Sequence, residues 1–217
     1  GARYIGAKIG RFLTVDPMGI TEKDLLNPQR LNRYAYALNN PYRYVDPDGR
    51  EVRLTGHIAA KPYGRVTRPD SYHLAIVLMP DRPQDFTNRT GWKIAKDGKL
   101  SATLGGQCCK DSSLLDPLGK LQSAPNYPDD SLANGTFSQV VPTPAGMTDT
   151  KFIDSLISAA KSYGNDLNYD ALPSKDGGYN SNSYVSGVLG AAGATSPALN
   201  TGGKFQVPGY DKPIPLP

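Results

Sequence analysis

The sequence predicts an α+β fold in which an antiparallel sheet comes first and helices follow late in the chain. Of its 217 residues, 23 are glycine and 19 are proline. So many chain-turning residues require short elements and argue against a helical bundle. Strand-like apolar runs dominate the part after residue 50, whereas apolar residues at helical spacing appear only after residue 148.

The sheet is expected from two pairs of strands. Residues 52–60 and 72–79 are rich in β-branched and aliphatic side chains, and they predict a hairpin with a long connection. The apolar runs on either side of Asp97-Gly98 predict a second hairpin, because this dipeptide favours a two-residue turn. Residues 110–147 hold only short apolar runs among Pro, Asp, Ser and Asn, and they predict irregular chain around the sheet.

Two helices are expected. Thr148 can cap the first, whose apolar residues share one face and which should end at Gly164. The second should begin near Asn180 or Ser181 and stop at Gly193.

Charge and cysteine content limit the function. Residues 51–217 hold sixteen Lys and Arg against fifteen Asp and Glu, and this balance argues against nucleic-acid binding. No apolar run approaches the roughly 18 residues of a membrane span. The only cysteines, Cys108 and Cys109, are adjacent and can bridge only with strain, so we expect free thiols or a labile bond. With two Cys and two His, neither a metal site nor a cofactor is expected.

Residues 1–50 have a different character, with a tyrosine-rich stretch between two Asp-Pro-X-Gly turns, at 16–19 and 46–49. This segment resembles the end of the core of RHS/YD-repeat proteins, the shells of bacterial polymorphic toxins. The resemblance implies that residues 1–50 are an RHS core remnant and that residues 51–217 are a C-terminal effector domain. It also implies secretion by a dedicated system, action in a target cell during interbacterial competition, and two partners, the rest of the shell and a cognate immunity protein.

In many such proteins the aspartates of the paired motifs release the toxin by self-cleavage. The resemblance carries this role to Asp16 and Asp46. Here 26 residues separate Gly19 from Asp46, which departs from the usual spacing. The alternative is that both aspartates are turn residues.

The run from Gly177 to Val185 leads into the second helix, and His73 stands at the start of an apolar strand. A nucleophile in the first turn of a helix gains from the helix dipole and free N–H groups, and a strand-borne imidazole can act as its base. The order His73, then Asn-Ser-Asn-Ser-Tyr-Val, resembles a circularly permuted papain-like (NlpC/P60-related) arrangement. In that resemblance Ser181 takes the place of the cysteine nucleophile.

Serine needs a well-placed base, because its hydroxyl is far less acidic than a thiol. Three interpretations of Ser181 remain. It is a native serine nucleophile, it replaces a cysteine nucleophile to inactivate a toxin, or the domain is an enzyme that has lost its activity. Asn180, Asn182 and Ser183 are the candidate oxyanion or substrate residues. The plain alternative is that Asn180 or Ser181 is a helix cap.

His73 could instead be a half-buried strand histidine, with His57 as the reserve base. Thr103, Gln107 and Asp170 are the polar candidates for a third catalytic residue. Gln107 is preferred, because the glycines before it leave room for a substrate.

The expected function is hydrolysis or acyl transfer at an amide or ester of a peptidoglycan peptide, a protein or a lipid. The alternative is a non-catalytic effector module that binds its target.

Overall fold

The computed structural model describes residues 5–6, 11–14, 32, 34, 51–58, 71–80, 82–95, 98–110, 118–174, 177–199 and 206–216. The chain divides into two compact units, Gly1–Arg50 and Glu51–Pro217. In the first unit, β1 (Ile5–Gly6) pairs antiparallel with β2 (Arg11–Phe12). The candidate cleavage residues Asp16 and Asp46 lie outside the described residues.

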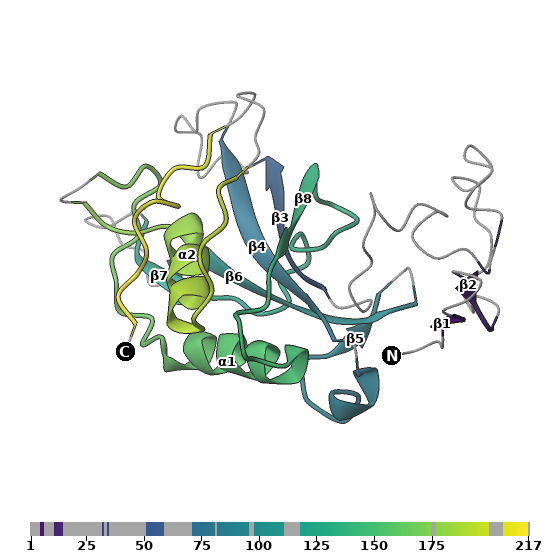
Figure 1. The fold of residues 1–217 in the computed structure, drawn as a ribbon. Helices are drawn as coiled ribbons and strands as arrows, with labels where there is room; N and C mark the ends of the chain where they lie inside the picture. The colour runs from purple at the N-terminus through teal and green to yellow at the C-terminus, as the bar shows by residue number, and fades with distance from the viewer. Residues whose placement is uncertain are drawn as a thin grey trace. The chain divides into compact units, whose positions relative to one another are not determined.

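The second unit is α+β, with a six-stranded sheet and two α-helices among its described residues (Figure 1). The strand order is β5-β6-β4-β3-β8, with β7 paired to β6, and every pairing is antiparallel. The strands are β3 (Glu51–Ile58), β4 (Tyr72–Met79), β5 (Lys93–Ile94), β6 (Leu100–Lys110), β7 (Lys120–Ser123) and β8 (Phe137–Val141). A short 3-10 helix, η5 (Pro83–Asp85), follows β4.

Both predicted hairpins are present, but the second has three connecting residues and not the expected two, because the Ala95 amide donates to the Lys99 carbonyl at 2.8 Å. β3 and β4 pair along their whole length, from Glu51 opposite Met79 to Ile58 opposite Tyr72. β5 pairs with β6, and Gly98 between them has φ of +80°, which the absence of a side chain permits.

The expectation of irregular chain across residues 110–147 is wrong, because β7 and β8 lie within it. Both strands are short, and each pairs with a longer strand, β6 or β3. β8 finds its partner β3 some 80 residues earlier in the chain, as Gly56 opposite Phe137 illustrates. Such pairing leaves no local apolar signal.

Both predicted helices are confirmed, as α1 (Asp149–Ser162) and α2 (Ser181–Ala191). The Thr148 hydroxyl accepts a hydrogen bond from the Lys151 amide at 3.3 Å and caps α1. The helices pack on one face of the sheet, where alternate residues of the strands meet their apolar faces. This core includes Leu54, Leu74, Ile76, Leu78, Leu104, Phe152, Leu156, Val185 and Leu189.

The opposite face of the sheet is crossed by the loop between β7 and β8. Its first part hydrogen-bonds to the outer edge of β6, where the Ala124 amide donates to the Gly105 carbonyl at 2.8 Å. Its last part reaches the outer edge of β3, where the Thr136 amide donates to the Gly56 carbonyl at 2.8 Å. The loop therefore passes over β4, which lies between β3 and β6.

The C-terminal segment 206–216 lies along α2. The Ile214 amide donates to the Ser183 carbonyl at 3.0 Å, and a Cβ on Gly187 would come within 2.4 Å of the Ile214 side chain. Gly187 therefore permits the close contact between tail and helix. None of the helices in the described part of the chain has the length and hydropathy to cross a membrane.

Cys108, on β6, is disulfide-bonded. The only other cysteine of the sequence is its neighbour Cys109. At Cys108 the structure therefore has a bond and not the free thiol that was the other expected outcome.

Candidate active site

The N-terminus of α2 is capped by Asn180. Its side-chain oxygen accepts hydrogen bonds from the amides of Asn182 at 2.9 Å and Ser183 at 3.0 Å. Its side-chain nitrogen donates to the Pro208 carbonyl at 2.9 Å. The helix-cap alternative thus applies to Asn180, and Ser181 is the first helical residue, only 4% exposed.

Asn182 fastens this end of the helix to β4 on both sides of His73. Its side-chain oxygen accepts from the Leu74 amide at 2.8 Å, and its nitrogen donates to the Tyr72 carbonyl at 2.8 Å. The pairing of β4 with β6 ends at Ala75, so Asn182 takes the place of a strand neighbour along the next stretch of β4. The two motifs that sequence analysis singled out, 108 residues apart, therefore meet in the fold.

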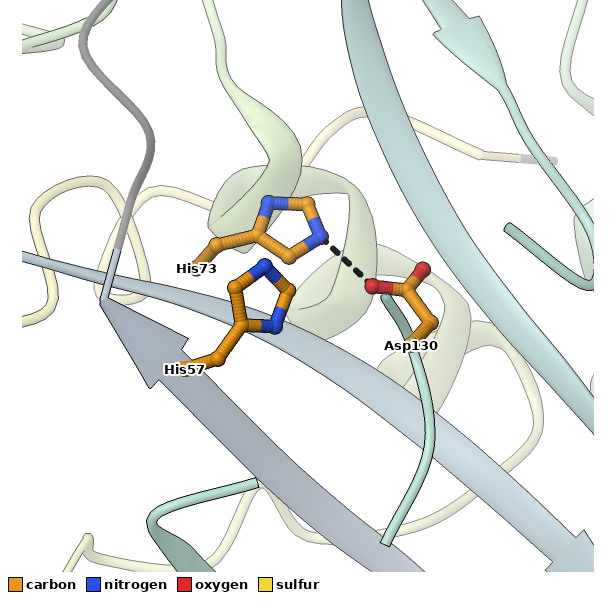
Figure 2. A group of neighbouring side chains, drawn as sticks. All are labelled: His57, His73 and Asp130. Carbon is orange, nitrogen blue, oxygen red and sulfur yellow. Dashed lines mark hydrogen bonds and ion pairs between the residues drawn. The ribbon is translucent and has the colours of Figure 1, made fainter. Parts of the chain in front are cut away.

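His73 contacts a buried carboxylate. Its Nε2 lies 3.0 Å from Oδ1 of Asp130, whose side chain is fully buried, while the His73 side chain is 10% exposed. Figure 2 shows that the other ring nitrogen of His73, Nδ1, points away from Asp130. Nε2 is therefore the ring nitrogen of His73 that faces Asp130, and Nδ1 is the ring nitrogen that does not.

His57 stands beside His73, because the two residues are opposite each other in the register of β3 and β4. Their ring centroids are 4.8 Å apart. Burial lowers the pKa of His57, the neighbouring His73 lowers it further, and Asp130 and Asp129 oppose the shift. The reserve base predicted from sequence therefore lies at the same site and favours its neutral form.

Gly105 and Gly106 provide the space for this arrangement. A Cβ on Gly105 would lie 2.2 Å from Oδ2 of Asp130, and a Cβ on Gly106 would lie 3.1 Å from the Cα of Ser181. The sequence suggested that the glycines leave room for a substrate. In the structure the room is filled by the Asp130 carboxylate on one face of β6 and by α2 on the other.

The preferred third residue, Gln107, lies on β6 opposite Gln122 of β7. The other two candidates, Thr103 and Asp170, are not seen bonded to His73: Thr103 is buried on β6, and Asp170 accepts from the Leu172 amide at 3.0 Å. The side chain that contacts Nε2 of His73 is instead Asp130, so the assignment moves from Gln107 to Asp130.

Asp130 was missed because it stands in a stretch rich in Asp and Pro that carries no periodic signal. Only the path of the loop between β7 and β8 over the sheet brings its carboxylate to β4.

The candidate oxyanion residues are engaged in structural bonds. The Ser183 hydroxyl donates to the Gly209 carbonyl at 2.9 Å, and the Asn180 and Asn182 side chains hold the helix end. Their side chains therefore do not serve as free oxyanion donors in this structure, because their hydrogens already have partners.

The remaining donor of the first turn, the Ser181 amide, is directed at Tyr169. Burial raises the pKa of Tyr169, and hydrogen bonds from the Ser181 hydroxyl and backbone N–H oppose that rise. The Tyr169 phenol oxygen is therefore the partner of the one amide in this turn that the Asn180 side chain and carbonyl do not accept from. The sequence carries no signal that distinguishes this residue, because tyrosine is common throughout the chain.

Comparison of the chain with protein-family models, with curated proteins and with solved structures finds no match. The case for a function therefore rests on the chemistry of the site and on the motifs of the sequence.

Proposed function

We propose that residues 51–217 are the effector domain of a bacterial RHS-repeat protein, a permuted papain-like hydrolase or acyltransferase. Ser181, at the cysteine position, is the nucleophile, His73 is the general base and Asp130 orients the imidazole. The observation that carries the proposal is the Asn182 side chain, which joins the helix start at Ser181 to both neighbours of His73.

The proton transfers of the proposed reaction run through His73. In the proposed mechanism Nε2 of His73 donates to Asp130, 3.0 Å away, and Nδ1 takes the proton of the nucleophile. The nucleophile then attacks the carbonyl carbon of an amide or ester, and the oxygen gains a negative charge. His73 returns its proton to the leaving group, and water or another acceptor removes the acyl group from the enzyme.

The N-terminal end of α2 supplies the electrostatic stabilisation of the transition state. The positive end of the α2 dipole and the Ser181 amide stabilise the developing oxyanion. Tyr169 must leave the amide before a substrate oxygen can take its place. Ser181 and His73 are 4% and 8% exposed, so substrate entry requires Tyr169 or the loop that carries Asp130 to move.

The biological setting follows the RHS resemblance of residues 1–50. The domain is carried by the shell, exported by a dedicated secretion system and delivered into a target cell. There it hydrolyses an amide or ester bond of a peptidoglycan peptide, a protein or a lipid, or transfers an acyl group to it. A cognate immunity protein protects the producing cell.

A second candidate function is a non-catalytic module that binds its target. The closed site favours it, because the side chains of Asn180, Asn182 and Ser183 are all used to hold the fold. In this alternative the His73–Asp130 pair only stabilises the sheet and its covering loop.

Growth inhibition tests the choice. The full chain is expressed in the cytoplasm and, with an added export signal, in the periplasm of a bacterium without the immunity protein. Catalysis predicts that Ser181→Ala, His73→Ala and Asp130→Asn each relieve inhibition, whereas Asp129→Asn, the exposed neighbour, does not. If the native chain is harmless and Ser181→Cys is toxic, the enzyme uses a cysteine. Inhibition that survives both Ser181→Ala and His73→Ala supports the binding module and refutes catalysis.

A further inference from the structure

His57, His73 and Asp130 bring three metal-ligating groups together. One ligand atom from each residue lies within 4.8 Å of the others, and Figure 2 shows the two imidazoles and the carboxylate gathered around one small region. They come from three different parts of the chain, β3, β4 and the loop between β7 and β8. A metal bound there would link the loop to the sheet.

Two atoms of this cluster lack a partner. Oδ2 of Asp130 and Nδ1 of His57 are buried, and neither has a hydrogen-bond partner among the described residues. Asp130 is only 1% exposed. A buried carboxylate oxygen without a donor is destabilising, and a bound cation would relieve this.

The ligand types select the metal. Two imidazoles and one carboxylate suit Zn²⁺ and related divalent transition ions, whereas Ca²⁺ and Mg²⁺ require mostly oxygen ligands. Ligands that surround one tetrahedral zinc at about 2 Å lie about 3.3 Å apart. The widest separation here, 4.8 Å, therefore closes with side-chain rotations and a small shift of the loop.

We propose that His57, His73 and Asp130 form a binding site for Zn²⁺, with an open fourth position for water. The metal takes the place of the Nε2 proton that His73 shares with Asp130, so one proton leaves when the ion binds. One consequence rests on the proposed function: His73 held by zinc and Asp130 neutralised by it can no longer act as base and orienting residue, so zinc inhibits the enzyme.

Calorimetry with ZnCl₂ tests the site without any activity assay. The full chain is used without a histidine tag, and no reductant is added, so that Cys108 stays in its bond. We expect one zinc per chain, and binding at least about tenfold weaker in both His57→Gln and Asp130→Asn. Asp129→Asn, which changes an exposed carboxyl next to the site, and Ser181→Ala should bind as the native chain does.

Co²⁺ gives a second measurement where a variant is unstable. The native chain with Co²⁺ should show the visible absorption bands of a tetrahedral nitrogen and oxygen site, and Zn²⁺ should remove them. Absence of saturable zinc binding, or binding that is unaffected by His57→Gln and Asp130→Asn, overturns the site. Failure of the proposed function is a separate result, because it is read from growth inhibition by Ser181→Ala.

Discussion

Replacing Asn182 tests whether its amide holds the helix start against β4. Asn182 is 2% exposed and makes bonds of 2.8 Å to the Leu74 amide and to the Tyr72 carbonyl, and one of 3.0 Å to the Pro208 carbonyl. Asn182→Ala strands the two β4 groups in the interior, at about 1–2 kcal/mol each. Alanine recovers about 0.6 kcal/mol through its higher helix propensity. The expected loss of stability is therefore about 1.5–3.5 kcal/mol.

Urea unfolding measures this loss, followed by the fluorescence of Trp92, the only tryptophan, whose ring lies 4.6 Å from that of Phe86. Asn134→Ala is the matched control, because this exposed asparagine donates only a 3.3 Å bond to the Pro128 carbonyl and should cost less than about 0.5 kcal/mol. Faster hydrogen exchange at the Leu74 amide should accompany the loss. A change below about 1 kcal/mol for Asn182→Ala would refute the fastening role.

Three further substitutions probe the site and the helices. Gly105→Ala places a methyl group 2.2 Å from the Asp130 carboxylate and should cost about 1–3 kcal/mol in urea unfolding, whereas Gly190→Ala, with open space around it, should be neutral or stabilising. Thr148→Ala removes the α1 cap and should cost about 1 kcal/mol in the same assay; no loss would contradict the capping bond. Burial, and then the neighbouring imidazole, lowers the pKa of His57 below 6.5, so the unfolded chain binds this proton more tightly. Protonation of His57 therefore does not reduce the free energy of unfolding above pH 6.5, and it lowers this free energy as the pH falls below 6.5. His57→Gln should reduce the slope of unfolding free energy against pH below pH 6.5, and an unchanged slope would contradict the lowered pKa of His57.

Most of the fold was predictable because its signals are local. The apolar runs of β3 and β4, the glycine turn before β6 and the caps of both helices are each read within a few residues. The bonds from Asn182 to Tyr72 and Leu74 bring the strand that carries His73 to the start of α2, whereas the pairing of the His73 and Ser181 side chains stays a prediction.

The parts that were missed depend on contacts between distant segments. β8 is a strand because β3 offers it an edge, and Asp130 reaches His73 because its loop crosses from β6 to β3. A lone aspartate among loop residues has no pattern that distinguishes it from its neighbour Asp129. Likewise, Tyr169 is tied to Ser181 by a bond that only the fold creates.

The central claim is that the start of α2 and His73 activate whatever nucleophile stands at position 181. Its most direct test is the thiol pKa of Ser181→Cys, read from the ultraviolet absorbance of the thiolate, which does not depend on reagent access to a buried site. The native chain is the blank for Cys108 and Cys109.

The helix dipole and the imidazole should lower the pKa of the new thiol well below the free value of about 8.5, and adding His73→Ala should raise it. A thiol that titrates at or above about 8.5, with no response to His73→Ala, would contradict the proposed mechanism and leave residue 181 as an ordinary first residue of a helix.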